Sequence, residues 1–125
     1  MKKVIQFIWI CVLGFSLKSC YYDETLPAQE IPDGTDVTFK VDIAPILTNC
    51  TTCHSGSTAP DLRNTQQAYN NLFPNYVVIG NPSNSKLYYN APGNSTSVHA
   101  NVGFTLDATQ LAYIKYWINH EALYE

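Results

Sequence analysis

The feature that most constrains this 125-residue chain is a run of five residues, Cys50-Thr51-Thr52-Cys53-His54. Residues three apart share one face of a helical turn, so the two thiols can act together. A zinc site would need two more ligands at motif spacing, and the chain has no second close cysteine pair. A thioredoxin-like dithiol would need a βαβ context, which the sequence lacks, and a plain disulfide would leave His54 without a role.

The same five residues have the C-x-x-C-H pattern of c-type haem attachment. Two thiols on one helical turn can add to the two vinyl groups along one edge of a porphyrin. The residue that follows, His54, is then placed to bring its imidazole under the iron as the proximal ligand. The motif therefore predicts one covalent haem c, attached at Cys50 and Cys53 and bound through iron by His54.

The amino-terminal segment indicates export from the cytoplasm. Two lysines precede an apolar run over residues 4–15 that is too short to span a bilayer comfortably, which favours a signal peptide over 1–19. It ends in Leu17-Lys18-Ser19-Cys20, which resembles a bacterial lipobox and implies acylation of Cys20, although Lys18 departs from the small or apolar residue usual there. The alternatives are ordinary secretory cleavage and an uncleaved anchor helix, and each also leaves the domain outside the cytoplasm.

Removal of residues 1–19 leaves four of the seven basic residues and all ten acids, a formal net charge of −6. Nucleic acid is therefore not an expected partner. Residues 20–35 contain two prolines, a glycine and four acids without an apolar stripe, so they are expected to tether a folded domain over 36–125 to the lipid. Asp23 and Glu24, shortly after Cys20, resemble a surface-export signal, which leaves a periplasm-facing and a cell-surface location both open.

Candidate capping residues indicate where the helices of the domain begin. Asp42 is expected to cap a first helix that carries Pro45 in its first turn. Asn64 is expected to cap a second helix that Pro74 stops, and a short helix is expected to start at Ser83.

The last helix is the best-marked element of the sequence. Asp107 and Gln110 form a capping box, and Leu106 and Leu111 are spaced as a hydrophobic staple. Its apolar stripe consists of Leu111, Ile114, Trp117 and Ile118. Because no strand alternation accompanies these helices, an all-α domain with long polar loops is predicted.

Three stretches together resemble a known family. "DIAPILTNCTTCHSG" resembles the start of a class I cytochrome c domain, and "VIGNPSNSKLYY" with "LDATQLAYIKYWINHEAL" resembles the later half of the planctomycete-type domains. The resemblance covers about residues 40–123. It implies a small class I cytochrome c-like fold in which the N- and C-terminal helices cross and long loops surround one haem.

The sequence departs from this family at the sixth iron ligand. The family's distal loop supplies a methionine before the last helix, whereas the only methionine here is Met1. His99 occupies the corresponding loop and is the candidate sixth ligand; a solvated His99 beside five-coordinate or water-bound iron is the alternative. His120, near the end of the last helix, is a second candidate, although a surface histidine favoured by the helix C-terminus is its expected role.

Three further residues are candidate contacts of the haem. Pro60 or Leu62 is expected to pack on the proximal face of the haem, and the Pro60 carbonyl is a candidate acceptor for the N–H of His54, unless Pro60 is an ordinary loop proline. Trp117 either touches the haem or packs as a core aromatic between helices.

The function expected from these features is electron transfer by a lipid-anchored, extracytoplasmic carrier that serves redox partner proteins and is not itself an enzyme. The alternative is a haem-based sensor or ligand-binding module with an open sixth site. A peroxidase or another subunit of an oxidoreductase complex is a third hypothesis. It is disfavoured because c-type peroxidases usually carry a second haem, and only one C-x-x-C-H is present.

Overall fold

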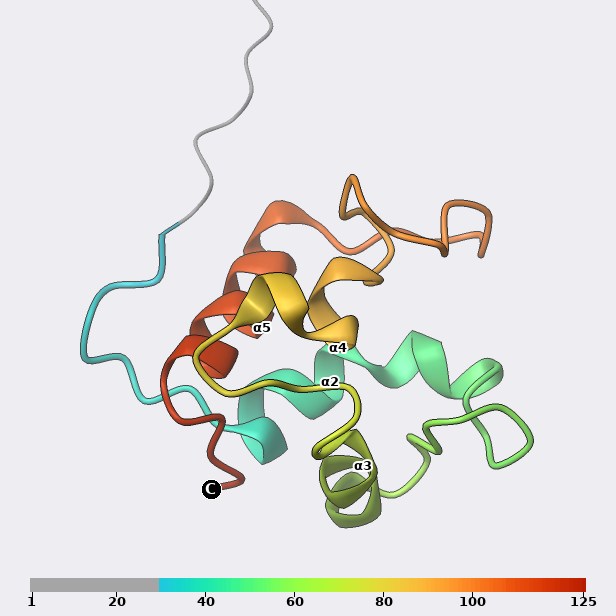
Figure 1. Ribbon diagram of the computed structural model, residues 1–125, viewed down its shortest axis with the longest axis horizontal. Helices are drawn as coiled ribbons and strands as arrows, with labels where there is room; N and C mark the ends of the chain where they lie inside the picture. The colour runs from blue at the N-terminus through green and yellow to red at the C-terminus, as the bar shows by residue number, and fades with distance from the viewer. Residues whose placement is uncertain (1–29) are drawn as a thin grey trace, which may run out of the picture.

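The computed structural model of the chain describes residues 30–125. The expected signal peptide 1–19, Cys20 and most of the tether 20–35 lie outside these residues, so those assignments remain predictions. The described part is helical and contains no strand, which confirms the all-α prediction (Figure 1). Its elements are η1 Phe39–Ile43, α2 Ala44–Ile46, η2 Thr48–Thr52, α3 Thr65–Leu72, η3 Pro82–Asn84, α4 Lys86–Tyr89 and α5 Ala108–Asn119. Among residues 30–125, no helix has the length and apolar character needed to cross a bilayer.

The first helical segment begins earlier than the sequence predicted. Its N-cap is Thr38 rather than Asp42, and the Thr38 side chain accepts the N–H of Val41. Asp42 lies within the first turn, where its carboxylate accepts the N–H of Thr38 at 2.8 Å. The prediction of an Asp42 cap was wrong because a second cap residue stands four positions earlier and uses Asp42 as its reciprocal partner. Pro45 does lie in the first turn of α2, as expected.

The second helix, α3, follows the prediction. The Asn64 side chain accepts the N–H of Gln67 at 3.1 Å, and the helix ends at Leu72, two residues before Pro74.

The predicted short helix from Ser83 is wrong, since η3 and α4 are separate and α4 begins after Ser85. The Ser85 side chain is fully buried and donates to the carbonyl of Asn81 at 2.9 Å. Its hydroxyl also accepts the N–H of Val78 at 2.9 Å. These bonds to an earlier loop hold Ser85 in an extended conformation, which interrupts the helix.

The last helix, α5, carries the predicted capping box. Asp107 accepts the N–H of Gln110 at 2.8 Å, and the Gln110 side chain accepts the N–H of Asp107 at 3.0 Å. The helix buries Trp117 and two isoleucines of its stripe completely.

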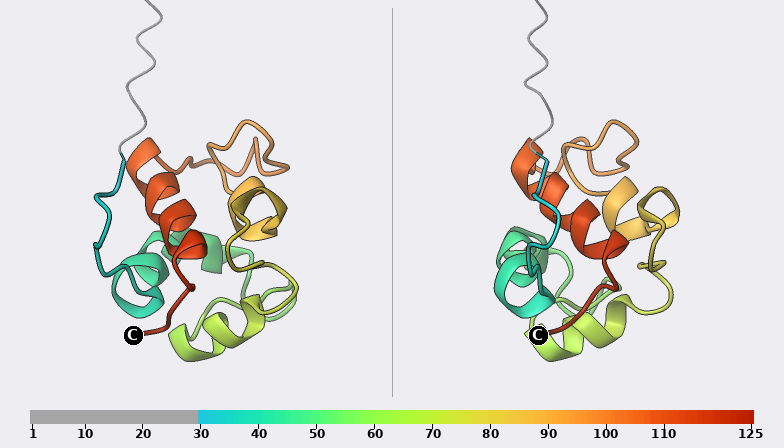
Figure 2. Two further views of the ribbon diagram at one scale, coloured as in Figure 1. Left: turned by 60° about the vertical axis from the view of Figure 1, so that its left-hand side comes forward. Right: turned by 90° about the vertical axis from the view of Figure 1, so that its left-hand side faces the viewer.

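The core lies where α5 crosses the first helical segment (Figure 2). The ring of Phe39 lies 5.5 Å from that of Trp117 and 5.4 Å from that of Tyr69 on α3. The carbonyl of Leu123 accepts both the N–H of Phe39 at 2.9 Å and the indole N–H of Trp117 at 2.8 Å. These contacts join both ends of the domain. Segments 54–64 and 93–105 extend from the opposite side of the helical body (Figure 1).

Candidate functional site

A cavity of about 640 Å³ lies between η2, the 54–62 segment, α4 and the 90–106 segment. Its volume is within the range of roughly 300–1,000 Å³ that is common for cofactor pockets. Its walls combine aliphatic and aromatic residues with a few polar groups: Leu47, Asn49, Cys50, Thr52, Cys53, His54, Thr58, Ala59, Pro60, Leu62, Leu72, Tyr76, Lys86, Leu87, Asn90, Ala91, Pro92, His99, Val102, Phe104 and Leu106. The cavity therefore contains every residue predicted to hold haem in the described part of the chain.

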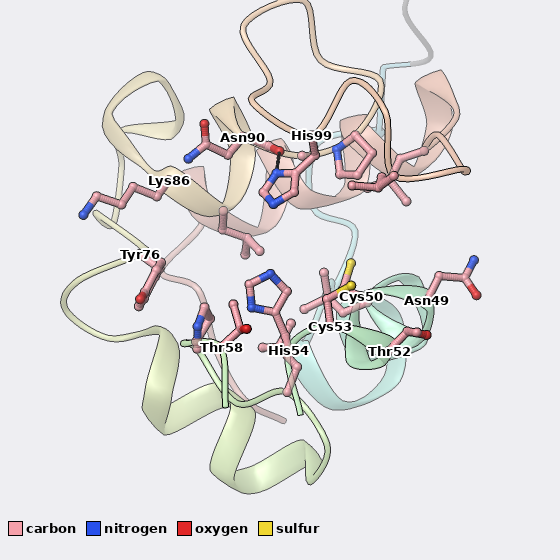
Figure 3. Close-up of a pocket in the computed structure, with 18 of the residues that line it drawn as sticks. Asn49, Cys50, Thr52, Cys53, His54, Thr58, Tyr76, Lys86, Asn90 and His99 are labelled. Atoms are coloured by element: carbon pink, nitrogen blue, oxygen red, sulfur yellow. Dashed lines mark hydrogen bonds between the residues drawn. The ribbon is translucent and has the colours of Figure 1, made fainter. Parts of the chain in front are cut away.

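The two cysteines lie on one wall of this cavity (Figure 3). A single turn positions them, because the N–H of Cys53 donates to the carbonyl of Cys50 at 3.2 Å, and so does the N–H of His54 at 2.9 Å. Both thiols are free, so the plain disulfide interpretation does not describe this structure.

The environment of Cys50 does not favour a reactive dithiol. Burial raises the pKa of the Cys50 thiol above its usual value, whereas redox-active cysteines generally have a lowered pKa. Within residues 30–125, no group of three or more His, Cys, Asp and Glu side chains is arranged to hold a metal ion. A zinc site at the motif thus lacks the further protein ligands that it would need.

His54 leaves the cysteine turn and points into the cavity (Figure 3). Its carbonyl accepts the N–H of Leu62 at 2.9 Å, which closes a loop beneath the imidazole. Pro60 and Leu62 both line the cavity, as expected for the proximal side. Of the two interpretations of Pro60, the bond from His54 to its carbonyl is not formed, because the buried Nδ1 of His54 has no hydrogen-bond partner in the described structure. Buried polar atoms without a hydrogen-bond partner are uncommon in folded proteins, and functional sites are among the places where they occur.

His99 points into the same cavity from the opposite wall (Figure 3). Its Nδ1 lies 2.8 Å from the carbonyl oxygen of Asn90, and its backbone N–H donates to the Ser97 hydroxyl at 3.0 Å. The Ser97 hydroxyl donates in turn to the Asn90 carbonyl at 2.7 Å. Because a carbonyl can only accept, Nδ1 of His99 carries the proton, and Nε2 keeps the lone pair that a metal would use.

The loop that carries His99 is closed at its base. The N–H of Leu106 donates to the carbonyl of Pro92 at 2.9 Å, so residues 93–105 leave and return at one place. Gly93 has a positive φ of 97° there and packs directly against the Leu106 backbone. This closure places His99 over the cavity rather than in solvent.

The relative position of the two imidazoles is the sharpest feature of the site. The ring centroids of His54 and His99 are 6.2 Å apart, with an angle of 59° between the ring planes. With a metal–imidazole bond of about 2.0–2.1 Å and a ligating nitrogen about 1.2 Å from its ring centroid, two axial imidazoles on one metal have centroids roughly 6.4 Å apart. The spacing of the two rings is therefore close to that of two imidazoles that share one metal.

Two other predicted residues lie away from the cavity. His120 is exposed at the C-terminus of α5, where its ring stacks on that of Tyr116 at 3.8 Å, as expected for a surface histidine. Trp117 is fully buried and does not line the cavity, so the core interpretation of Trp117 is the one that the structure supports.

The residues that hold and flank His99 were not predicted from the sequence. Asn90 acts through its backbone carbonyl, which leaves no side-chain pattern to recognise. Lys86 and Tyr76 also line the cavity. Lys86 could have been noticed in the sequence, because it is one of only four basic residues after residue 19 and lies inside a stretch that resembles the family.

In the three comparisons with known proteins, no family model, no curated protein and no solved structure matches this chain.

Proposed function

We propose that this chain is a monohaem c-type cytochrome that carries electrons outside the cytoplasmic membrane. The observation that carries the proposal is the facing pair of imidazoles, His54 and His99, at 6.2 Å across a cavity. The two free thiols of the C-x-x-C-H motif line the same cavity. Each feature alone is common in proteins, but the combination matches the requirements of a covalently attached, doubly ligated haem.

The chain's residues would divide the work of holding this group. Cys50 and Cys53 would attach one edge of the porphyrin, and His54 and His99 would bind iron from its two faces. The apolar walls, which include Leu47, would exclude water from both faces and help to set the reduction potential. The chemistry that haem supplies is a one-electron change between ferrous and ferric iron.

The arrangement of helices is compatible with the class I cytochrome c-like fold that the sequence resemblance implies. The contact between η1 and α5 supports this assignment, since that fold has crossing terminal helices. With the export segment and Cys20, we propose a lipid-anchored carrier that faces the periplasm or the cell surface. Its partners would be redox proteins that approach the haem edge, and it would have no catalytic reaction of its own.

The hydrogen bonds around His99 favour an electron carrier over a sensor with an open sixth site. Asn90 orients the His99 ring and Ser97 holds its backbone, so the protein's own hydrogen bonds keep this imidazole at the cavity. A carrier benefits from such fixed ligation because both oxidation states then keep one geometry.

Haem attachment is the test. Full-length protein produced with an active cytochrome c maturation system should carry one haem that survives acid–acetone extraction and denaturing electrophoresis. The double variant Cys50→Ser/Cys53→Ser should lose covalent haem, whereas Thr51→Ala, which alters the residue between the thiols that does not line the cavity, should retain it. A wild-type protein that is colourless, or that holds zinc, would overturn the proposal.

A further inference from the structure

The electrostatics of the cavity wall are uneven. Among all the residues that line the cavity, Lys86 is the only one with a formal charge at neutral pH, and no aspartate or glutamate is present. The sequence beyond residue 19 nevertheless has ten acids and four basic residues. A single cation in an acid-free cavity of an acidic protein favours a ligand with an anionic end.

Lys86 stands on the side of the cavity opposite the thiols. Figure 3 shows Cys50 and Cys53 at one side, Lys86 with Tyr76 at the other, and the two imidazoles between them. The axis from His54 to His99 fixes the plane of a flat ligand, so the thiols and Lys86 would face opposite edges of it.

The position of Lys86 is supported by its neighbours. Its ammonium group lies 5.6 Å from the centre of the Tyr76 ring, a cation–π distance. The backbone ties the two residues together, because the N–H of Leu87 donates to the Tyr76 carbonyl at 3.0 Å.

Lys86 also lacks a carboxylate partner in the structure. The two ion pairs of residues 30–125 are Lys40 with Glu125 and Arg63 with Asp61. The Lys86 ammonium is therefore available to an anion that enters the cavity.

From these observations we infer that Lys86 binds a propionate carboxylate of the haem and raises the reduction potential of the iron. The inference rests on the proposed function. The two vinyl groups and the two propionates occupy opposite edges of the porphyrin, so attachment at Cys50 and Cys53 turns the carboxylates toward Lys86. A cation at this edge disfavours the oxidised form, which carries one more positive charge than the reduced form.

The test is the midpoint potential of the purified haem protein. Lys86→Gln should lower it, changing the ratio of oxidised to reduced protein at a fixed potential by about tenfold, or about 59 mV for a one-electron couple. Lys86→Arg keeps the charge and should stay close to wild type.

Lys115→Gln is the matched control, since Lys115 on α5 is exposed, as Lys86 is, but does not line the cavity. Solvent and salt screen a charge that lies away from the cavity, so the effect of Lys115→Gln on the potential should be small. The inference is overturned if Lys86→Gln leaves the potential unchanged, or if Lys115→Gln shifts it equally. Failure of the proposed function is a separate result, because the wild-type protein would then carry no covalent haem at all.

Discussion

The carbonyl oxygen of Asn90 lies 2.8 Å from Nδ1 of His99 and fixes which nitrogen of that ring can reach the cavity. Asn90 follows α4 directly, whereas His99 lies in the middle of the loop that leads to α5. The end of a helix therefore orients a side chain that a loop supplies. Replacing individual side chains can therefore test which group occupies the proposed sixth coordination position.

Replacing His99 is expected to open the proposed sixth coordination position of the iron. His99→Ala removes the imidazole that faces His54, so the haem should change from low-spin to high-spin and bind carbon monoxide readily. Visible spectroscopy with and without carbon monoxide measures this. His120→Ala serves as the control, since His120 is exposed and stacks on Tyr116, and its spectrum should match wild type. High-spin, carbon monoxide-binding iron already in the wild-type protein would reject His99 as a ligand and favour a sensor.

Replacing Ser97 should loosen the same ligand without removing it. The Ser97 hydroxyl accepts the backbone N–H of His99 and donates to the Asn90 carbonyl, so Ser97→Ala frees the segment that carries the imidazole. Loss of such supporting bonds typically weakens a metal ligand by about 10–100-fold. Stopped-flow mixing of reduced protein with carbon monoxide should show faster binding than in wild type and slower binding than in His99→Ala. Ser95→Ala, at an exposed position nearby, should bind at the wild-type rate.

Local capping chemistry explains which elements could be predicted from the sequence. Asn64 and the Asp107–Gln110 box act within one turn, so their patterns are visible in the sequence and appear in the structure. Asp42 misled the prediction because Thr38 competes for the same role, and a pattern alone does not rank two candidate cap residues four positions apart.

The candidate site was predictable only in part. The motif and the absence of a usable methionine pointed to His54 and His99, and the structure places these two side chains opposite each other. The contact of His99 with Asn90 depends on a loop closed between Pro92 and Leu106, which is a long-range property of the chain's path. The sequence left two interpretations of Pro60 open for the same reason, because a bond from His54 to its carbonyl depends on the path of the 54–62 segment.

The ion pair between Asp61 and Arg63 should affect acid stability. The Arg63 guanidinium, through paired hydrogen bonds, lowers the pKa of Asp61 from 3.8 to about 2. A carboxyl with a lowered folded-state pKa adds stability that is fully present above its unfolded value and disappears as the pH falls through the folded one.

Asp61→Asn should therefore be less stable than wild type at pH 6, and the difference should vanish below about pH 2. Urea unfolding at a series of pH values measures the difference. Asp33→Asn alters an exposed acid that makes no ion pair within residues 30–125 and should show no comparable pH-dependent loss. A difference between Asp61→Asn and wild type that stays constant down to pH 1.5 would show that the ion pair is not the cause.

The base of the His99 loop should tolerate no side chain at Gly93. A Cβ there would lie 2.5 Å from the carbonyl oxygen of Leu106, whereas a Cβ at Gly103, which also has a positive φ, meets nothing within 4 Å. Both alanine variants incur the left-handed backbone penalty of about 1–2 kcal/mol. Gly93→Ala must in addition displace the Leu106 backbone, so it should lose about 1–3 kcal/mol more than Gly103→Ala. Urea unfolding of the two variants isolates this contribution, because the backbone penalty cancels in the comparison. Equal losses would mean that the loop base moves freely, and the fixed position of His99 could not then be attributed to closure of the loop by Pro92 and Leu106.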